Sequence, residues 1–252
     1  MQAANTIRNA VARVHTLRAA TAAQTGLLEA TRAIKNFQAR RFQSTYADLL
    51  VSPTYARATR FFLEELYSEK DYSQRDAQFS RIAGALQKYF PQQVVATAVA
   101  MAELHALTEE LDHQMALAWL AQGPMPRLMT QPTAQDIGRY VQTWRKVGRQ
   151  TDRDLQLSVV LQVGRELDRL TRTPGLRMML RLMRRPAEVA GLSALQTFLE
   201  SGFDTFAAMA GKGLVAQQFM TTIHIREAVW LAKLYGAAPA DCENDLAVCL
   251  RK

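Results

Sequence analysis

The feature of the sequence that most limits its fold is the helical spacing of its apolar residues. Apolar side chains recur every three or four residues over long stretches, and the longest stretch covers residues 92–121. This spacing places the apolar side chains on one face of an α-helix. No segment alternates apolar and polar residues over the length of a strand, so we expect no β-sheet. The sequence therefore predicts an all-α protein.

Proline, glycine and capping residues divide this pattern into separate helices. Capping boxes, in which a Ser or Thr is followed three residues later by an acid, are predicted to begin at Ser73, Thr133 and Thr151. Ser52 followed by Pro53 predicts a further helix start. The predicted helices cover about 24–49, 53–67, 73–90, 92–121, 133–148, 151–173, 176–185, 187–210 and 214–235, with a proline-containing loop at 123–132 and glycines at 211 and 213. We therefore expect a single-domain bundle of about eight or nine helices.

Two terminal segments are expected to lie outside this bundle, which we assign to residues 23–236. Residues 1–22 form an amphipathic basic leader helix, because three arginines precede the first acid, Glu29, and one face is apolar. Two interpretations of the leader remain open: it packs on the domain or on a partner, or it serves a membrane surface or targeting. Residues 237–252 are expected to form a C-terminal tail.

The composition of the chain excludes several classes of protein. Hydrophobic residues make up 48% of the chain, which excludes a disordered protein, and 12 Gly and 8 Pro are too few for a loop-rich β protein. The formal charge of +8 favours anionic partners. Acidic residues are interspersed through the chain, so this charge does not indicate nucleic-acid binding. No apolar run reaches the roughly 18–20 residues of a membrane span.

The chain has only two cysteines, Cys242 and Cys249, both near its C-terminal end. Two cysteines cannot supply a disulfide framework, so the fold must be stabilised by its core. We expect two free thiols in a reducing cytosol, and therefore a cytoplasmic protein. A local disulfide between the two is the alternative.

Residues 61–76 resemble an uncharacterised bacterial family named for an FFLEELYGP motif. The string FFLEELY at residues 61–67 is followed by DYSQRD at residues 71–76. Residues 68–70 are Ser, Glu and Lys where that family usually has Gly, Pro and one more residue, so the turn departs from the pattern.

Shorter strings similar to the same family follow in the same order. They are AELHAL at residues 102–107, GFDTF at 202–206 and the pair RE at 226–227. The likeness covers about residues 40–235. It implies a bacterial, cytoplasmic helical protein, and it implies no reaction, because we know of no activity assigned to the family.

Polar residues interrupt the apolar pattern of the helix at 92–121. His105, Glu109 and Asp112 are spaced i, i+4 and i+7, which places an imidazole and two carboxylates on one helix face. One interpretation is a pocket in which the histidine acts as a base or ligand beside carboxylates. The other is a histidine at the edge of the core, hydrogen-bonded to a carboxylate.

A second interruption lies in the last predicted helix, where Glu227 occupies an apolar stripe beside Arg226. A carboxylate among apolar neighbours is costly unless it is paired, so we expect Glu227 to meet a cation. It is either a buried salt bridge or part of a pocket wall shared with His105. The whole candidate polar pocket comprises Glu103, His105, Glu109, Asp112, Arg226, Glu227 and Glu64.

Glu110 and His113 form one E-x-x-H string. Paired copies of this string hold two metals in ferritin-like carboxylate bundles. We find no second copy, and therefore predict no metal site. The cofactor, if the protein uses one, is not indicated by the sequence.

The segment 165–185 is rich in arginine. Its last part predicts an amphipathic helix with a basic face made of Arg177, Arg181, Arg184 and Arg185. This candidate surface is either simply solvated or contacts an anionic partner or lipid surface. Nucleic acid is the weakest alternative, because the segment lacks aromatic residues for base stacking.

Known catalytic motifs are absent from the sequence: there is no glycine-rich phosphate loop, G-x-S-x-G, H-E-x-x-H or C-x-x-C. Two hypotheses remain. The first is a non-catalytic binding or regulatory protein with a helix groove or a small apolar pocket. The second is an enzyme, or a metal- or haem-binding protein, centred on His105 and the nearby carboxylates.

Overall fold

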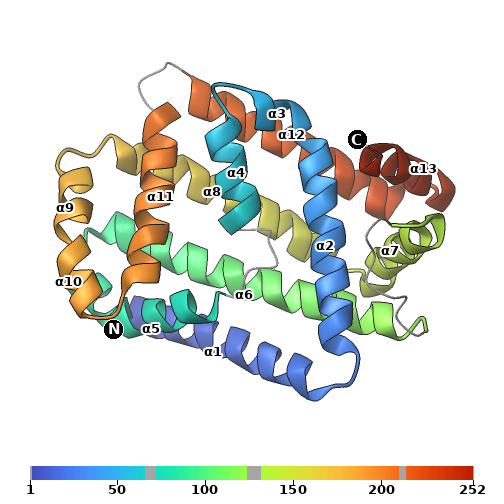
Figure 1. Cartoon of the computed structure of the whole chain (residues 1–252), viewed down its shortest axis with the longest axis horizontal. Coiled ribbons are helices and arrows are strands. Elements are labelled where there is room, and N and C mark those ends of the chain that lie inside the picture. The colour runs from blue at the N-terminus through green and yellow to red at the C-terminus, as the bar shows by residue number, and fades with distance from the viewer. Residues whose placement is uncertain (1, 66–71, 124–131, 210–213, 252) are drawn as a thin grey trace. The chain divides into compact units, whose positions relative to one another are not determined.

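The computed structural model describes residues 2–65, 72–123, 132–209 and 214–251. Within these ranges the chain forms thirteen helices and no strand (Figure 1). The helices are α1 (Gln2–Ala23), α2 (Leu27–Thr45), α3 (Ala47–Val51), α4 (Ala56–Glu65), α5 (Ser73–Tyr89), α6 (Gln92–Leu120), α7 (Ala134–Val147), α8 (Gln150–Thr171), α9 (Leu176–Leu182), α10 (Arg184–Val189), α11 (Ser193–Met209), α12 (Val215–Gly236) and α13 (Pro239–Leu250). The all-α prediction is therefore confirmed.

The predicted count of eight or nine helices is too low. The long helix expected over residues 24–49 is two helices, because the backbone at Tyr46 leaves the helical region with φ −113° and ψ 20°. The basic helix expected over 176–185 is also divided, at Met183, and α10 continues to Val189. The leader, expected to be a helix outside the bundle, forms α1, whereas α13 is an additional helix in the segment expected to be a tail.

The predicted caps agree with the structure at one of three capping boxes. The Thr133 side chain accepts from the Asp136 N–H, and the Asp136 carboxylate accepts from the Thr133 N–H at 2.8 Å. The other two assignments are wrong, because Tyr72 rather than Ser73 is the N-cap of α5 and Thr151 lies inside α8. A short polar side chain near a helix start thus indicates the start only to within a residue or two.

The start predicted at Ser52 is also displaced. Ser52 is the C-cap of α3, and α4 begins at Ala56. The Ser52 hydroxyl oxygen nevertheless accepts from the N–H of Thr54 and Tyr55, so it does organise the turn between the two helices. The predicted turn at residues 68–70, the glycines at 211 and 213, and most of the loop predicted at 123–132 lie outside the described residues.

The chain divides into two compact units, each made from three stretches of sequence. Unit 1 comprises residues 1–15, 70–106 and 158–222. Unit 2 comprises residues 16–69, 107–157 and 223–252. Helices α1, α6, α8 and α12 each contribute residues to both units.

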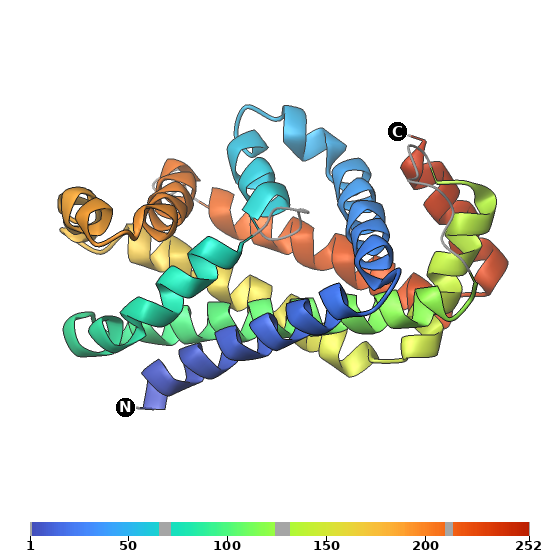
Figure 2. The ribbon, with the colours of Figure 1, turned by 60° about the horizontal axis from the view of Figure 1, so that its bottom comes forward.

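The core of unit 1 forms where small and apolar side chains of α1 meet α5 and the first half of α6 (Figure 2). From α1 it takes Ala4, Ile7, Ala10 and Val14, so the apolar face of this helix is buried in the core of unit 1. Helix α11 packs against α5, α9 and α10. Alanines dominate the contribution of α6, and they allow the helices to approach closely.

The core of unit 2 is built around aromatic residues. Phe37 of α2 stacks on Tyr140 of α7 with ring centroids 3.9 Å apart, and Trp144 and Trp119 are buried beside them. Helix α13 packs against α7 and α2, and it places Cys242 and Leu246 in this core. Both cysteines are free thiols, with Cys242 buried and Cys249 partly exposed. Because burial is the main effect on it, the pKa of the Cys242 thiol is raised.

No helix in the described parts of the chain combines the length and hydropathy that a transmembrane segment requires.

Candidate functional site

The most organised polar group of unit 2 is the carboxylate of Glu227 on α12. Arg41 of α2 donates to both of its oxygens, from Nη1 at 3.2 Å and from Nη2 at 2.7 Å. The Tyr46 hydroxyl donates to Oε1 at 2.7 Å. All three residues are buried. The expectation that Glu227 meets a cation is met, and the cation comes from a helix nearly two hundred residues earlier in the chain.

Aromatic rings enclose the other side of the Arg41 guanidinium. Its central carbon lies 4.1 Å from the centroid of the Phe42 ring and 5.7 Å from that of Trp230. Burial disfavours the Arg41 cation, but the charge of Glu227 and its hydrogen bonds outweigh that effect, so the pKa of Arg41 is raised. Arg41 is therefore a permanent charge, and Glu227 is the group that compensates it most strongly among the described residues.

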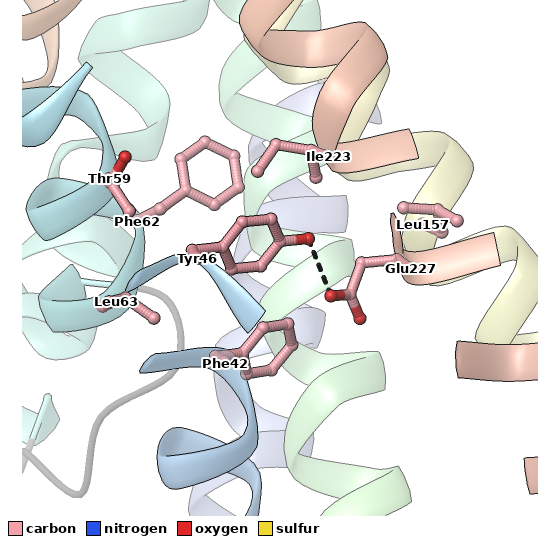
Figure 3. A pocket seen from close by; sticks show the side chains of 8 residues that line it. All are labelled: Phe42, Tyr46, Thr59, Phe62, Leu63, Leu157, Ile223 and Glu227. Atoms are coloured by element: carbon pink, nitrogen blue, oxygen red, sulfur yellow. Dashed lines mark hydrogen bonds between the residues drawn. The ribbon is translucent and has the colours of Figure 1, made fainter. Parts of the chain in front are cut away.

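A small pocket opens beside this ion pair, within unit 2 (Figure 3). Its volume is about 20 Å³. The walls are mostly apolar and come from α2, α4, α8 and α12, with Tyr46 just after α2. The lining residues are Phe42, Tyr46, Thr59, Phe62, Leu63, Leu157, Ile223 and Glu227. The bonded pair of Tyr46 and Glu227 gives this apolar space its hydrogen-bonding side.

A second polar cluster of unit 2 surrounds Lys35 of α2. Its ammonium donates to Glu109 at 2.7 Å and lies 4.0 Å from Asp112. The side chain of Gln38 donates to the other oxygen of Asp112 at 3.2 Å. Sequence spacing correctly placed Glu109 and Asp112 on one helix face, but it gave no indication of Lys35 or Gln38.

Burial controls the protonation of this cluster. It raises the pKa of Asp112, because the nearby cations Lys35 and Arg153 do not fully offset the loss of solvation. Burial lowers the pKa of Lys35, but the charges of Asp112 and Glu109 outweigh it, and the net direction is upward. Tyr140 is fully buried nearby, and burial raises its pKa to about 12. Burial and the hydrogen bonds to Lys35 and Gln38 therefore make this cluster a structural network.

His105 has a different partner, within unit 1. Its Nε2 lies 2.9 Å from the carboxylate of Asp76, at the start of α5. The Tyr72 ring meets the imidazole edge-on, and the Arg75 guanidinium lies over the same Tyr72 ring, 4.1 Å from its centroid. Asp76, which the sequence assigned to a capping box, is thus the carboxylate that orients His105.

The remaining predicted pocket residues are distributed over the surface. Glu103 forms an exposed ion pair with Arg13 in unit 1. Arg226 turns away from Glu227 and donates to both carboxylate oxygens of Asp48 in unit 2, which lowers the pKa of Asp48. Glu64 is exposed. The buried polar groups therefore combine predicted residues, Glu227, Glu109 and Asp112, with partners that the sequence did not single out.

The most important of the missed residues is Arg41. It continues the buried stripe of α2 that includes Leu27, Ile34 and Phe37, so helical spacing places it facing inward. That spacing was the available signal for a buried cation. Its neighbour Arg40 is directed to the other side, where it donates to Asn36.

The predicted basic surface lies on α9 and α10 of unit 1. Arg177 forms an ion pair with Asp204, and Arg184 forms a two-pronged pair with Glu200, both acids being on α11. Arg181 and Arg185 are exposed. In the described part of the chain, no three His, Cys, Asp or Glu side chains are grouped as metal ligands would be.

Comparison with known proteins places this arrangement in a family. No curated protein and no solved structure matches the chain. A family model described as "Domain of unknown function (DUF8198)" matches residues 17–241, which include α2 to α12 and therefore the Arg41–Glu227 pair and its pocket. The chain belongs to this family.

Proposed function

We propose that the protein is a non-catalytic binding protein whose pocket in unit 2 holds a small apolar group. The observation that carries the proposal is the pocket itself: its walls are apolar, and a fixed hydrogen-bonding pair lies at one side. Ligand sites commonly combine apolar walls with a few placed polar groups. The likeness of residues 61–67 to the FFLEELYGP proteins falls partly on this wall, at Phe62 and Leu63.

The pocket supports binding better than catalysis. The charge of Glu227 is neutralised by Arg41, and three hydrogen bonds from Arg41 and Tyr46 fix its orientation. A carboxylate held in this way cannot turn freely toward a substrate, but it retains room to accept a further hydrogen bond. The favoured ligand group is therefore short and apolar, and it carries a hydroxyl or amine that donates to Glu227.

The size of the pocket limits what can enter. About 20 Å³ holds little more than one water-sized group. A longer chain or ring requires movement of the lining side chains, of which Leu63 is only partly buried. We therefore expect small alcohols and amines to bind weakly, and a larger ligand to bind by inserting one end.

The test is methyl NMR on the full chain with short aliphatic alcohols and amines as probes. Ile223 lines the pocket and is buried, whereas Ile225, two residues along α12, is 58% exposed. We expect probes to shift the methyl signals of Ile223, Leu157 and Leu63, and Ile223→Phe to abolish the shifts by filling the pocket. Ile225→Phe, the matched control, should leave them intact. Probes that move none of these methyls, or that bind Ile223→Phe as well, would show that the pocket is not a ligand site.

One observation favours a second candidate function. A carboxylate that orients a histidine is an arrangement used in general acid–base catalysis, and Asp76 contacts His105 in this way. Such a site would be centred on His105 with Asp76, since Glu109 and Asp112 bond to Lys35 and Gln38. His105→Gln tests it: loss of a hydrolytic activity on a panel of ester substrates, with unchanged thermal stability, is the expected result. A change in stability alone would leave His105 a structural residue.

A further inference from the structure

The surface of α9 and α10 in unit 1 exposes large apolar side chains. Met178 is 62% exposed, Leu182 is 69% exposed and Val189 is 91% exposed. Isolated apolar residues are normal on a protein surface, but here four occur within twelve residues of one segment, since Met183 is also 39% exposed. This concentration points to a surface that is covered in use.

Positive charge surrounds the same side chains. Residues 176–189 contain four arginines and one acid, Glu188. Asp204 and Glu200 of α11 neutralise Arg177 and Arg184. Arg181 and Arg185 are exposed and form no ion pair with any described residue. The charge of Arg181 also acts on Glu200, and Arg185 adds a further exposed cation, so the segment presents a net positive charge beside its apolar side chains.

The local backbone places these groups in neighbouring rows. Met178 and Leu182 are one turn apart, as are Arg181 and Arg185. Met183, between α9 and α10, keeps a near-helical conformation, and its carbonyl accepts from the N–H of Ala187. Helices α9 and α10 are attached to the rest of unit 1 by their other side, because Ala187 is buried and the Leu180 carbonyl accepts from the side chain of Gln196 of α11, which lies beside them (Figure 1).

We propose that the α9–α10 surface, defined by Met178, Arg181, Leu182, Arg185 and Val189, binds the surface of an anionic lipid bilayer. Apolar side chains interleaved with arginines fit the interfacial layer, where the aliphatic groups enter the acyl region and the guanidinium groups remain among the phosphates. Charge complementarity selects anionic headgroups. Nucleic acid fits less well, because residues 176–190 contain no aromatic side chain for stacking on bases.

The first experiment is cosedimentation of the full chain with vesicles of mixed phosphatidylglycerol and phosphatidylcholine, compared with vesicles of phosphatidylcholine alone. Binding should require the anionic lipid and should weaken with added salt. Each arginine near an anionic surface contributes about fivefold to partitioning, so Arg181→Gln with Arg185→Gln should reduce binding by about 25-fold.

The matched control removes the same charge elsewhere. Arg57 and Arg60 are exposed on α4, and replacing both by Gln should leave vesicle binding within about twofold of the wild type if location rather than net charge matters. Equal losses from both double variants would overturn the proposal, because they would show attraction by net charge only. All variants should retain the far-ultraviolet circular dichroism and melting temperature of the wild type, since the altered side chains are exposed.

The second experiment reports insertion of the apolar residues. In Leu182→Trp the new side chain should shift its emission to shorter wavelength with anionic vesicles. In Val51→Trp, at a position in unit 2 that is 81% exposed, it should not. No shift at position 182, or no binding to anionic vesicles, would overturn the proposal. So would tighter binding to single-stranded RNA or to an acidic peptide that anionic vesicles fail to displace.

Discussion

Two arginine–glutamate pairs in this protein have the same chemistry and opposite settings. In unit 2, Arg41 and Glu227 form a two-pronged pair whose side chains are 5% and 11% exposed. In unit 1, Arg184 and Glu200 also form a two-pronged pair, but the Arg184 side chain is 60% exposed. Because their hydrogen-bond geometry is similar, the difference in burial is what should determine whether each pair anchors the fold or can exchange its partner.

The buried pair fixes a position in the fold. Both charges have lost most of their hydration, so each depends on the other, and removing one partner leaves a buried charge without its opposite. Tyr46 adds a third contact and makes the arrangement a rigid side of the pocket. The exposed pair is screened by water and salt, so Arg184 can exchange Glu200 for another anion at little cost. The first arrangement suits a preformed site, and the second suits a surface that meets a partner.

The largest expected effect comes from breaking the buried pair. Glu227→Gln keeps the shape of the side chain but leaves the Arg41 charge buried, so we expect a loss of about 3–5 kcal/mol in the free energy of unfolding, measured in urea at pH 7. Glu227→Ala should cost as much or more. A loss near 1 kcal/mol would mean that solvent reaches Arg41. The contributions of the buried and the exposed pair to stability would then differ less than their burial indicates.

Tyr46→Phe removes one hydrogen bond from the same carboxylate and leaves the ion pair in place. A hydrogen bond to a charged group contributes about 1.5–3 kcal/mol, and this is the loss expected in urea. Tyr89 is 70% exposed, so Tyr89→Phe is the control and should not change the midpoint. If both variants changed the free energy of unfolding equally, the hydrogen bond from Tyr46 to Glu227 would not contribute to stability.

The buried side of the comparison also predicts a pH effect at Tyr140. Its pKa is raised from 10.0 to about 12 by burial, so the unfolded chain ionises this group first. The stabilisation is fully present below pH 10 and is lost as the pH rises towards 12. At pH 11 the wild type should have lost about 1.4 kcal/mol more than Tyr140→Phe, relative to neutral pH, in matched urea titrations. Parallel pH curves for the two proteins would contradict the assigned burial.

Asp112 should behave differently from Glu227 although both are buried. Burial raises its pKa, so the folded chain holds the proton more tightly, and the stability contributed by Asp112 is lost as the pH rises from its unfolded value towards its folded one. Asp112→Asn should therefore change stability at pH 7 by less than about 1 kcal/mol, because Lys35 keeps Glu109. As the pH rises from 4 to 7, the free energy of unfolding of Asp112→Asn should increase relative to that of the wild type. A relative loss over that range would reverse the assigned direction of the pKa.

The smallest effect is expected for Glu200→Gln, which breaks the exposed pair. Its unfolding midpoint in urea should stay within the reproducibility of the measurement, at low and at high salt. The substitution also leaves Arg184 without its acid, and it should strengthen binding to anionic vesicles. A clear destabilisation would show that the exposed pair contributes to the packing of α10 on α11.

The sequence by itself determined the local features of this protein. Helical spacing of apolar residues is imposed by the backbone repeat, so it predicted the helices, the apolar face of α1 and the inward direction of Glu227. The capping box at Thr133 and the glycine at 148 could be read in the same way, since each acts within a few residues. Spacing also placed Glu109 and Asp112 on one face of α6.

Only the tertiary structure decided which groups meet. Spacing along α6 relates His105 to Glu109, yet His105 contacts Asp76 and Glu109 contacts Lys35. Arg226 is the neighbour of Glu227 in sequence, but adjacent helical residues point in different directions, and the cation that bonds Glu227 is Arg41. A helical pattern specifies the direction of a side chain about its own axis. The partner in that direction depends on how distant helices pack, and for this chain packing selected Arg41, Tyr46 and the pocket beside them.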